Sequence, residues 1–123
     1  MPGRLFLTLL ISLCLLTAAA QPGKDYHVRE FTTDNGLPSN GIKSMQWDEE
    51  NGFLWIATEA GMSRYNGLDF TNFTKENTRG LSHERMAYVV KNIQGAIFAA
   101  DVSNNVVQVK SNTLQHLPLP ETE

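Results

Sequence analysis

The sequence predicts an all-β fold, a partial β-propeller of about two four-stranded blades plus a lone leading strand, preceded by a signal peptide. Short segments rich in aromatic and β-branched residues follow one another over residues 42–117, and turns containing Gly, Asn or Asp separate them. The apolar pattern of these segments recurs after 44 residues. Propeller blades repeat at about this length. The alternative, a β-sandwich, also has regularly spaced turns but no reason to repeat its packing positions.

Residues 1–20 predict a secretory signal peptide. Arg4 supplies the positive charge, and Leu5–Leu16 is a nearly continuous apolar run that is too short to span a membrane, which takes about 20 residues. The small residues Ala18–Ala20 fit a cleavage site before Gln21. The alternative is an uncleaved N-terminal anchor. The single cysteine, Cys14, lies in this leader, so we expect a periplasmic chain without disulfides.

The remainder, residues 21–123, is expected to form an incomplete propeller that begins with a lone outer strand over residues 25–34. The end of this segment and the three residues after it read Phe-Thr-Thr-Asp-Asn-Gly-Leu (residues 31–37). This stretch is similar to Phe-Thr-Lys-Glu-Asn, two further residues and Gly-Leu over residues 73–81. The similarity predicts that residues 25–34 are a copy of the last strand of a blade. Such a strand closes a propeller ring by pairing with the final blade, which removes an open sheet edge.

Residues 35–78 are expected to form the first blade. Its turns are predicted at Asp48–Gly52, Glu59–Gly61 and Asn66-Gly67, and the Asn-Gly pair favours a type I′ turn with positive φ at both residues. The strands between these turns are predicted at residues 42–47, 53–58, 62–65 and 70–74.

Residues 79–121 are expected to form a degenerate second blade, in which Phe98 takes the place of Trp55. A helix over residues 82–91 is an alternative, but the repeat favours a strand there. The face of this blade that would meet a third blade is expected to be apolar and to include Ile97 and Phe98. The strands are predicted at residues 86–91, 96–100, 106–110 and 113–117.

Composition and motifs exclude several classes of function for this segment. The chain of 123 residues has a net charge of −3, so it lacks the basic excess that nucleic-acid binding needs. No nucleophile motif, paired catalytic carboxylates or phosphate-binding glycine loop is present, and we expect no enzyme activity and no cofactor. The histidines His27, His83 and His116 fall in different repeat contexts, which argues against a metal site.

The first repeat resembles the two-component regulator propeller repeat, whose pattern is approximately N-G-L-P-S-N, then D-x-x-G-x-L-W-I-G-T-x-x-G-L-x-R-Y-D-G-x-x-F-x-x-F. Ala57, Met62 and Asn66 depart from it. The second copy is degenerate, and with the leading strand the resemblance covers nearly all of residues 25–117. The matching residues are Asn35–Asn40, Ile42, Asp48, Gly52, Leu54–Ile56, Thr58, Gly61, Arg64, Tyr65, Gly67, Phe70 and Phe73.

The resemblance implies the N-terminal part of a periplasmic ligand-sensing region of a two-component histidine kinase. In that family such repeats precede a membrane helix and a kinase core, and many members respond to oligosaccharides. The implied partners are an oligosaccharide ligand and the remaining blades of a larger, inner-membrane, dimeric parent. Two alternatives stay open: a fragment of a secreted propeller enzyme acting on carbohydrate, and a non-catalytic periplasmic interaction module.

The loop Asn35–Asn40 leads into the innermost strand of the first blade, and loops of this kind lie on a face of the propeller disc, where ligands usually bind. Ser39, Asn40 and, in the second copy, His83 are therefore candidates for ligand contacts. A set of repeat residues is instead expected to be structural, although Trp47 and Trp55 could alternatively stack on sugar rings. This structural set is Leu37, Trp55, Tyr65, Phe70 and Phe73.

Overall fold

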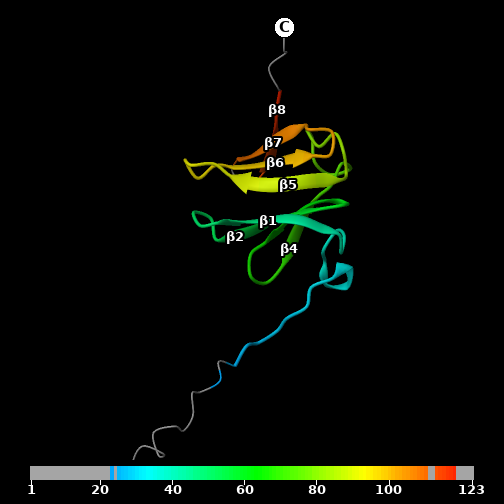
Figure 1. Ribbon diagram of the computed structural model, residues 1–123. Helices are drawn as coiled ribbons and strands as arrows, with labels where there is room; N and C mark the ends of the chain where they lie inside the picture. Colours follow the sequence, from blue (N-terminus) through cyan, green and yellow to red (C-terminus); the bar gives the residue numbers. More distant parts are fainter. Residues whose placement is uncertain (1–22, 24, 111–112, 119–123) are drawn as a thin grey trace, which may run out of the picture.

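The computed structural model describes residues 23, 25–110 and 113–118, and the predicted signal peptide lies outside them. Two four-stranded antiparallel sheets make up the described fold, and they stack face to face with strand β1 beside strand β5 (Figure 1). The one helical element of the described ranges is a 3₁₀ turn, η1 (Thr33–Asn35). In this part of the chain no helix is both long and apolar enough to cross a membrane. The predicted all-β class is confirmed.

Each sheet is a meander in which consecutive strands are neighbours. The first sheet has the order β1-β2-β3-β4 and the second has the order β5-β6-β7-β8. The observed strands begin and end within one residue of the predicted ones, and the segment for which a helix was an alternative ends in strand β5. The bounds are β1 (Ile42–Asp48), β2 (Phe53–Thr58), β3 (Gly61–Tyr65), β4 (Phe70–Phe73), β5 (Met86–Lys91), β6 (Ile97–Asp101), β7 (Val106–Lys110) and β8 (Thr113–Leu117).

Strand register decides which side chains enter the core between the sheets, because residues directly opposite each other point to the same face. Trp55 lies opposite Arg64, and Met62 lies opposite Ala57 on one side and Phe73 on the other, so these side chains share one face of the first sheet. Trp55 and Met62 belong to the buried core, so this face is turned towards the second sheet. From the second sheet, the row Val89, Ala99 and Val107 meets it. The buried core consists of Trp55, Ala57, Met62, Leu81, Met86, Val89, Ile97, Ala99, Val107 and Leu114.

The opposite face of each sheet points away from this core and is called its outer face. Ile97 belongs to the core between the sheets and is 3% exposed, so its predicted place on the free face of the second sheet was wrong. The reason is the two-residue period of a strand, which places neighbouring residues such as Ile97 and Phe98 on opposite faces. The outer face of the first sheet carries Met45, Trp47, Leu54, Ile56, Tyr65 and Phe70, and that of the second carries Tyr88, Val90, Phe98, Ala100, Val106 and Leu117.

The Asn66-Gly67 turn differs from the predicted type I′ geometry. Gly67 has φ +97°, but among the described non-glycine residues only Asn104 has a positive φ, so Asn66 does not adopt the left-handed conformation. The side-chain oxygen of Asn66 instead accepts hydrogen bonds from the backbone N–H groups of Leu68 and Asp69. An Asn side chain that mimics the backbone in this way stabilises a longer loop.

Residues 25–34 do not form the predicted lone outer strand. Residues 25–32 belong to no strand, and the 3₁₀ turn follows them. A strand needs the hydrogen bonds of a neighbouring strand, and most of this segment, drawn in blue, runs away from both sheets (Figure 1). The similarity to residues 73–81 is nevertheless structural, because the two segments share a turn. Thr32 N–H donates to Asn35 Oδ1 at 3.0 Å, and Thr74 N–H donates to Asn77 Oδ1 at 2.8 Å.

Candidate functional site

The three residues predicted from the sequence to contact a ligand, Ser39, Asn40 and His83, all lie at one end of the stacked sheets. We call this end the Glu59 end. At this end β1 and β5 begin, and β2 and β6 end. Its connections are loop 36–41, turn 59–60, segment 74–85 and turn 102–105. Glu59 N–H donates a hydrogen bond to the carbonyl of Gly41 at 3.1 Å, so the first two of these connections are joined through the backbone.

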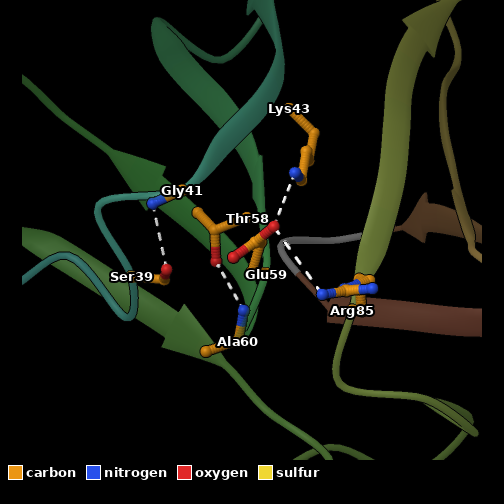
Figure 2. Close-up of polar contacts among 7 residues, drawn as sticks. All are labelled: Ser39, Gly41, Lys43, Thr58, Glu59, Ala60 and Arg85. Carbon is orange, nitrogen blue, oxygen red and sulfur yellow. Dashed lines mark hydrogen bonds and ion pairs between the residues drawn. The ribbon is translucent and has the colours of Figure 1, made fainter.

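Ser39 and Asn40 have specific structural partners in the loop before β1. Ser39 Oγ accepts a hydrogen bond from Gly41 N–H at 3.0 Å (Figure 2). Asn40 Oδ1 accepts from Thr33 N–H at 2.8 Å, which ties the loop back to the 3₁₀ turn. These bonds hold both side chains in place at the surface, as a preorganised binding loop requires. The same bonds also explain the two residue types without any ligand.

Glu59 joins the two sheets at this end. Its carboxylate lies 2.6 Å from Lys43 Nζ on β1 and 3.8 Å from Arg85, the residue before β5, and Figure 2 shows both cations pointing at it. The hydrogen bond and charge of Lys43, together with the charge of Arg85, lower the pKa of the Glu59 carboxyl. Because all three side chains are exposed, the ion pairs contribute little stability, but they connect the two sheets at this end. Sequence reasoning missed this cluster, because Arg85 lies 26 residues beyond Glu59 and only the stacking brings them together.

Asp101 organises the same end of the second sheet. It is 2% exposed, and it accepts hydrogen bonds from Ser103 N–H, Asn105 N–H and Asn105 Nδ2 at 2.8–3.0 Å. Burial alone would raise the pKa of this carboxyl, but the hydrogen bonds from Asn105 and Ser103 and the charge of His83 outweigh burial and lower the pKa. His83 itself is exposed. No hydrogen bond within the described residues joins His83 to Ser39 or Asn40.

A hollow of about 420 Å³ lies at the opposite end of the sheets, which we call the Asp48 end. It separates the β1–β2 turn from the β5–β6 turn. Asp48 is 4% exposed there, and it accepts hydrogen bonds from Asn51 and from Trp55 Nε1. The lining residues are Asp48, Glu50, Asn51, Gln94, Gly95, Ala96, Ile97 and Val109.

The repeat residues expected to be structural lie in or beside the sheet packing. Trp55 is fully buried and packs on Phe73 with ring centroids 5.5 Å apart. On the outer face of the first sheet, Tyr65 stacks on Phe70 at 4.7 Å, and its hydroxyl donates to the carbonyl of Gly67 at 2.7 Å. Leu37 is 7% exposed. Trp47, on the same outer face, is half exposed.

The described residues hold no group of three or more His, Cys, Asp or Glu side chains that could bind a metal ion. The buried carboxylates of Asp48 and Asp101 are each occupied by hydrogen bonds of their own turns. The polar residues of both ends therefore offer hydrogen-bonding surfaces.

Comparisons with known proteins give a similarity to solved structures. No protein-family model matches the chain, and no curated protein matches it. Among solved structures, the chain is similar to the extracellular domain of a hybrid two-component system from B. thetaiotaomicron, with 20% sequence identity and a TM-score of 0.62. The similarity covers 75% of this chain and 13% of that much longer one. At this identity the likeness shows a shared fold.

Proposed function

We propose that the chain supplies two consecutive blades of a β-propeller in the N-terminal, periplasmic sensor region of a two-component histidine kinase. The likeness to the extracellular domain of such a system carries this proposal. The first repeat supports it independently, because its motif residues occupy the turns and packing positions that a repeated blade needs. In this role the chain has no catalytic activity and takes no cofactor.

The propeller arrangement is supported by two equivalent aromatic contacts. Phe73, at the end of the first sheet, packs against the core that includes Leu114, and Val109 of the second sheet packs against the same core. Phe31, its counterpart in the leading segment, packs against Tyr65 at 5.0 Å and Phe70 at 5.3 Å, which are the residues equivalent to Val109 and Leu114. Phe31 thus packs on the outer face of the first sheet, where a preceding blade is proposed to lie.

Sensing is proposed to work through the intact propeller. A periplasmic solute, with oligosaccharides as the proposed class, binds one arrangement of a dimeric, membrane-bound parent more tightly than another. Binding therefore shifts the kinase towards the arrangement that the solute prefers. The Glu59 end presents the proposed contacts Ser39, Asn40 and His83. Ser39 and Asn40 are already held by Gly41 and Thr33, so binding there orders little additional structure.

Calorimetric titration of the complete extracellular region with a panel of oligosaccharides tests this function. We expect saturable binding of at least one oligosaccharide, and a weaker affinity for the His83→Ala and Asn40→Ala variants than for the control variant Ile93→Ala. Ile93 is a suitable control because it is fully exposed in a turn at the Asp48 end. Turnover of an oligosaccharide, instead of binding, would overturn the sensor function in favour of a propeller enzyme. Absence of binding across the panel would overturn the oligosaccharide class.

A further inference from the structure

The chain contains four Asn-Gly pairs, the dipeptide in which asparagine loses ammonia most readily. The nucleophile of that reaction is the backbone nitrogen that follows the asparagine, and glycine leaves this nitrogen without a side chain beside it. All four asparagines are exposed, so exposure does not distinguish them. What distinguishes them is the hydrogen bonding of each glycine N–H. The pairs are Asn35-Gly36, Asn40-Gly41, Asn51-Gly52 and Asn66-Gly67.

The glycine N–H is held by a hydrogen bond in the first three pairs. One of these bonds, from Gly41 to Ser39, is drawn in Figure 2. A nitrogen whose N–H is held in this way must first break that bond before it can attack a side chain. The acceptors are the Thr33 carbonyl for Gly36 at 3.2 Å, Ser39 Oγ for Gly41 at 3.0 Å and the Asp48 carbonyl for Gly52 at 2.9 Å.

Gly67 differs from these three glycines. It lies in the loop between β3 and β4, and its N–H donates to no acceptor among the described residues. Its carbonyl, in contrast, accepts a hydrogen bond from the hydroxyl of Tyr65 at 2.7 Å, which holds the loop in this conformation. The nitrogen of Gly67 is therefore free to act as a nucleophile.

Two backbone donors polarise the side-chain carbonyl of Asn66. Leu68 N–H and Asp69 N–H donate to Asn66 Oδ1 at 2.9 Å and 2.8 Å. Negative charge develops on this oxygen when a nucleophile attacks Cγ, and N–H donors at about 2.7–3.1 Å stabilise such a charge. The side chains of Asn35 and Asn40 also accept backbone hydrogen bonds, but the glycine that follows each of them has no free N–H.

We propose that Asn66 is a site of spontaneous deamidation. Hydroxide removes the proton of the Gly67 nitrogen, which attacks Cγ of Asn66 and forms the new C–N bond of a succinimide ring. The bond from Cγ to the side-chain nitrogen breaks, and this nitrogen takes a proton from water and leaves as ammonia. Water then opens the ring at one of its two carbonyls. The net reaction consumes one water, releases one ammonia and leaves aspartate or isoaspartate at position 66.

The two products change the loop in different ways. Aspartate adds a negative charge and keeps an oxygen that can accept from Leu68 and Asp69. Isoaspartate adds a methylene group to the backbone between β3 and β4, so the side chain no longer bridges the loop in the same way. Deamidation therefore changes the charge and geometry of the Asp48 end, where β3 ends and β4 begins. The inference does not depend on the sensor function.

Incubation of the purified chain at pH 8, followed by trypsin digestion and mass spectrometry, tests the proposal. Trypsin cuts after Lys and Arg, so Asn66 falls in peptide 65–75 and Asn51 in peptide 44–64. Asn35 and Asn40 share peptide 30–43, in which fragmentation separates them. Incubation in heavy-oxygen water labels only the deamidation that occurs during the experiment. We expect deamidation of Asn66 to be at least about threefold faster than that of the other three, which must first break a hydrogen bond.

Two variants test the role of the glycine N–H. Ser39→Ala frees the N–H of Gly41, so it is expected to speed deamidation of Asn40 and to leave that of Asn66 unchanged. Gly67→Ala places a methyl group beside the nucleophile, so it is expected to slow deamidation of Asn66. The added Cβ meets no atom within 4 Å, and circular dichroism verifies that both variants are folded.

Unfolding in urea separates the effect of the structure from that of the local sequence. Urea removes the hydrogen bonds of all four pairs, so the four rates are expected to converge. A folded chain in which Asn66 is not the fastest of the four would overturn the proposal. The same spread of rates in urea as in the folded chain would also overturn it, because the selectivity would then come from the sequence alone.

Discussion

The hydroxyl of Ser44 joins the two sheets at their innermost strands. It donates to the carbonyl of Val89 at 3.1 Å and accepts from the N–H of the same residue at 3.3 Å. Ser44→Ala removes both bonds and leaves two backbone groups of a buried residue unpaired. An unpaired buried group costs about 1–3 kcal/mol. Because Ser44 is half-buried and water can reach part of the site, we expect a loss of about 1–2 kcal/mol of unfolding free energy.

Thermal unfolding at one fixed protein concentration measures this loss. A domain of this size loses roughly 4–8 °C in Tm for each kcal/mol, so Ser44→Ala is expected to melt clearly below wild type. Ser103→Ala is the matched control, because Ser103 is exposed and contributes only its backbone N–H, to Asp101. Equal melting temperatures for the two variants would refute the claim that Ser44 holds the sheets together.

Three further variants test the core, a turn and the buried carboxylate. Trp55→Ala, at a fully buried position, is expected to cost about 3–5 kcal/mol and to remove the near-ultraviolet circular dichroism of the packed core. Gly61→Ala is expected to lower Tm more than Gly67→Ala, because both have positive φ but only at Gly61 would the new Cβ meet the Phe73 carbonyl. The lowered pKa of Asp101 means that its contribution to stability is present above its unfolded-state pKa, about 3.9, and is lost as pH falls through the lower folded-state pKa. Urea unfolding from pH 6 to pH 3 is therefore expected to show a smaller acid loss for Asp101→Asn than for wild type.

The strands were predictable because local chemistry and the repeat agree. Phe53–Thr58 is a run of aromatic, aliphatic and β-branched residues that ends at the Glu59–Gly61 turn. Gly61 has φ +116°, a conformation that favours glycine, so its position in the sequence marked the turn reliably. Both copies of the repeat carry such signals, and each copy supports the assignment of the other.

The lone outer strand and the place of Ile97 could not be predicted, because both depend on neighbours that are distant in the sequence. A sequence pattern shows that residues 25–34 suit a strand, but hydrogen bonds to another strand decide whether they form one. Which face of a blade meets the next depends on the stacking direction. That direction assigns Ile97 to the core and Phe98 to the outer face.

The candidate site was predictable only in part. The repeat placed Ser39, Asn40 and His83 in loops at the same end of the sheets. It could not show that Ser39 and Asn40 bond to Gly41 and Thr33. The ion pair of Glu59 with Arg85 depends on the packing of one sheet on the other, so no local pattern announces it.

The central claim, that these two sheets are blades of a larger sensor, is tested most directly by sequencing the coding DNA beyond the codon for Glu123. We predict an open reading frame with further copies of the 44-residue repeat, then a membrane-spanning segment and histidine kinase motifs. A stop codon directly after Glu123, or a hydrolase or lyase domain in place of the kinase, would contradict it.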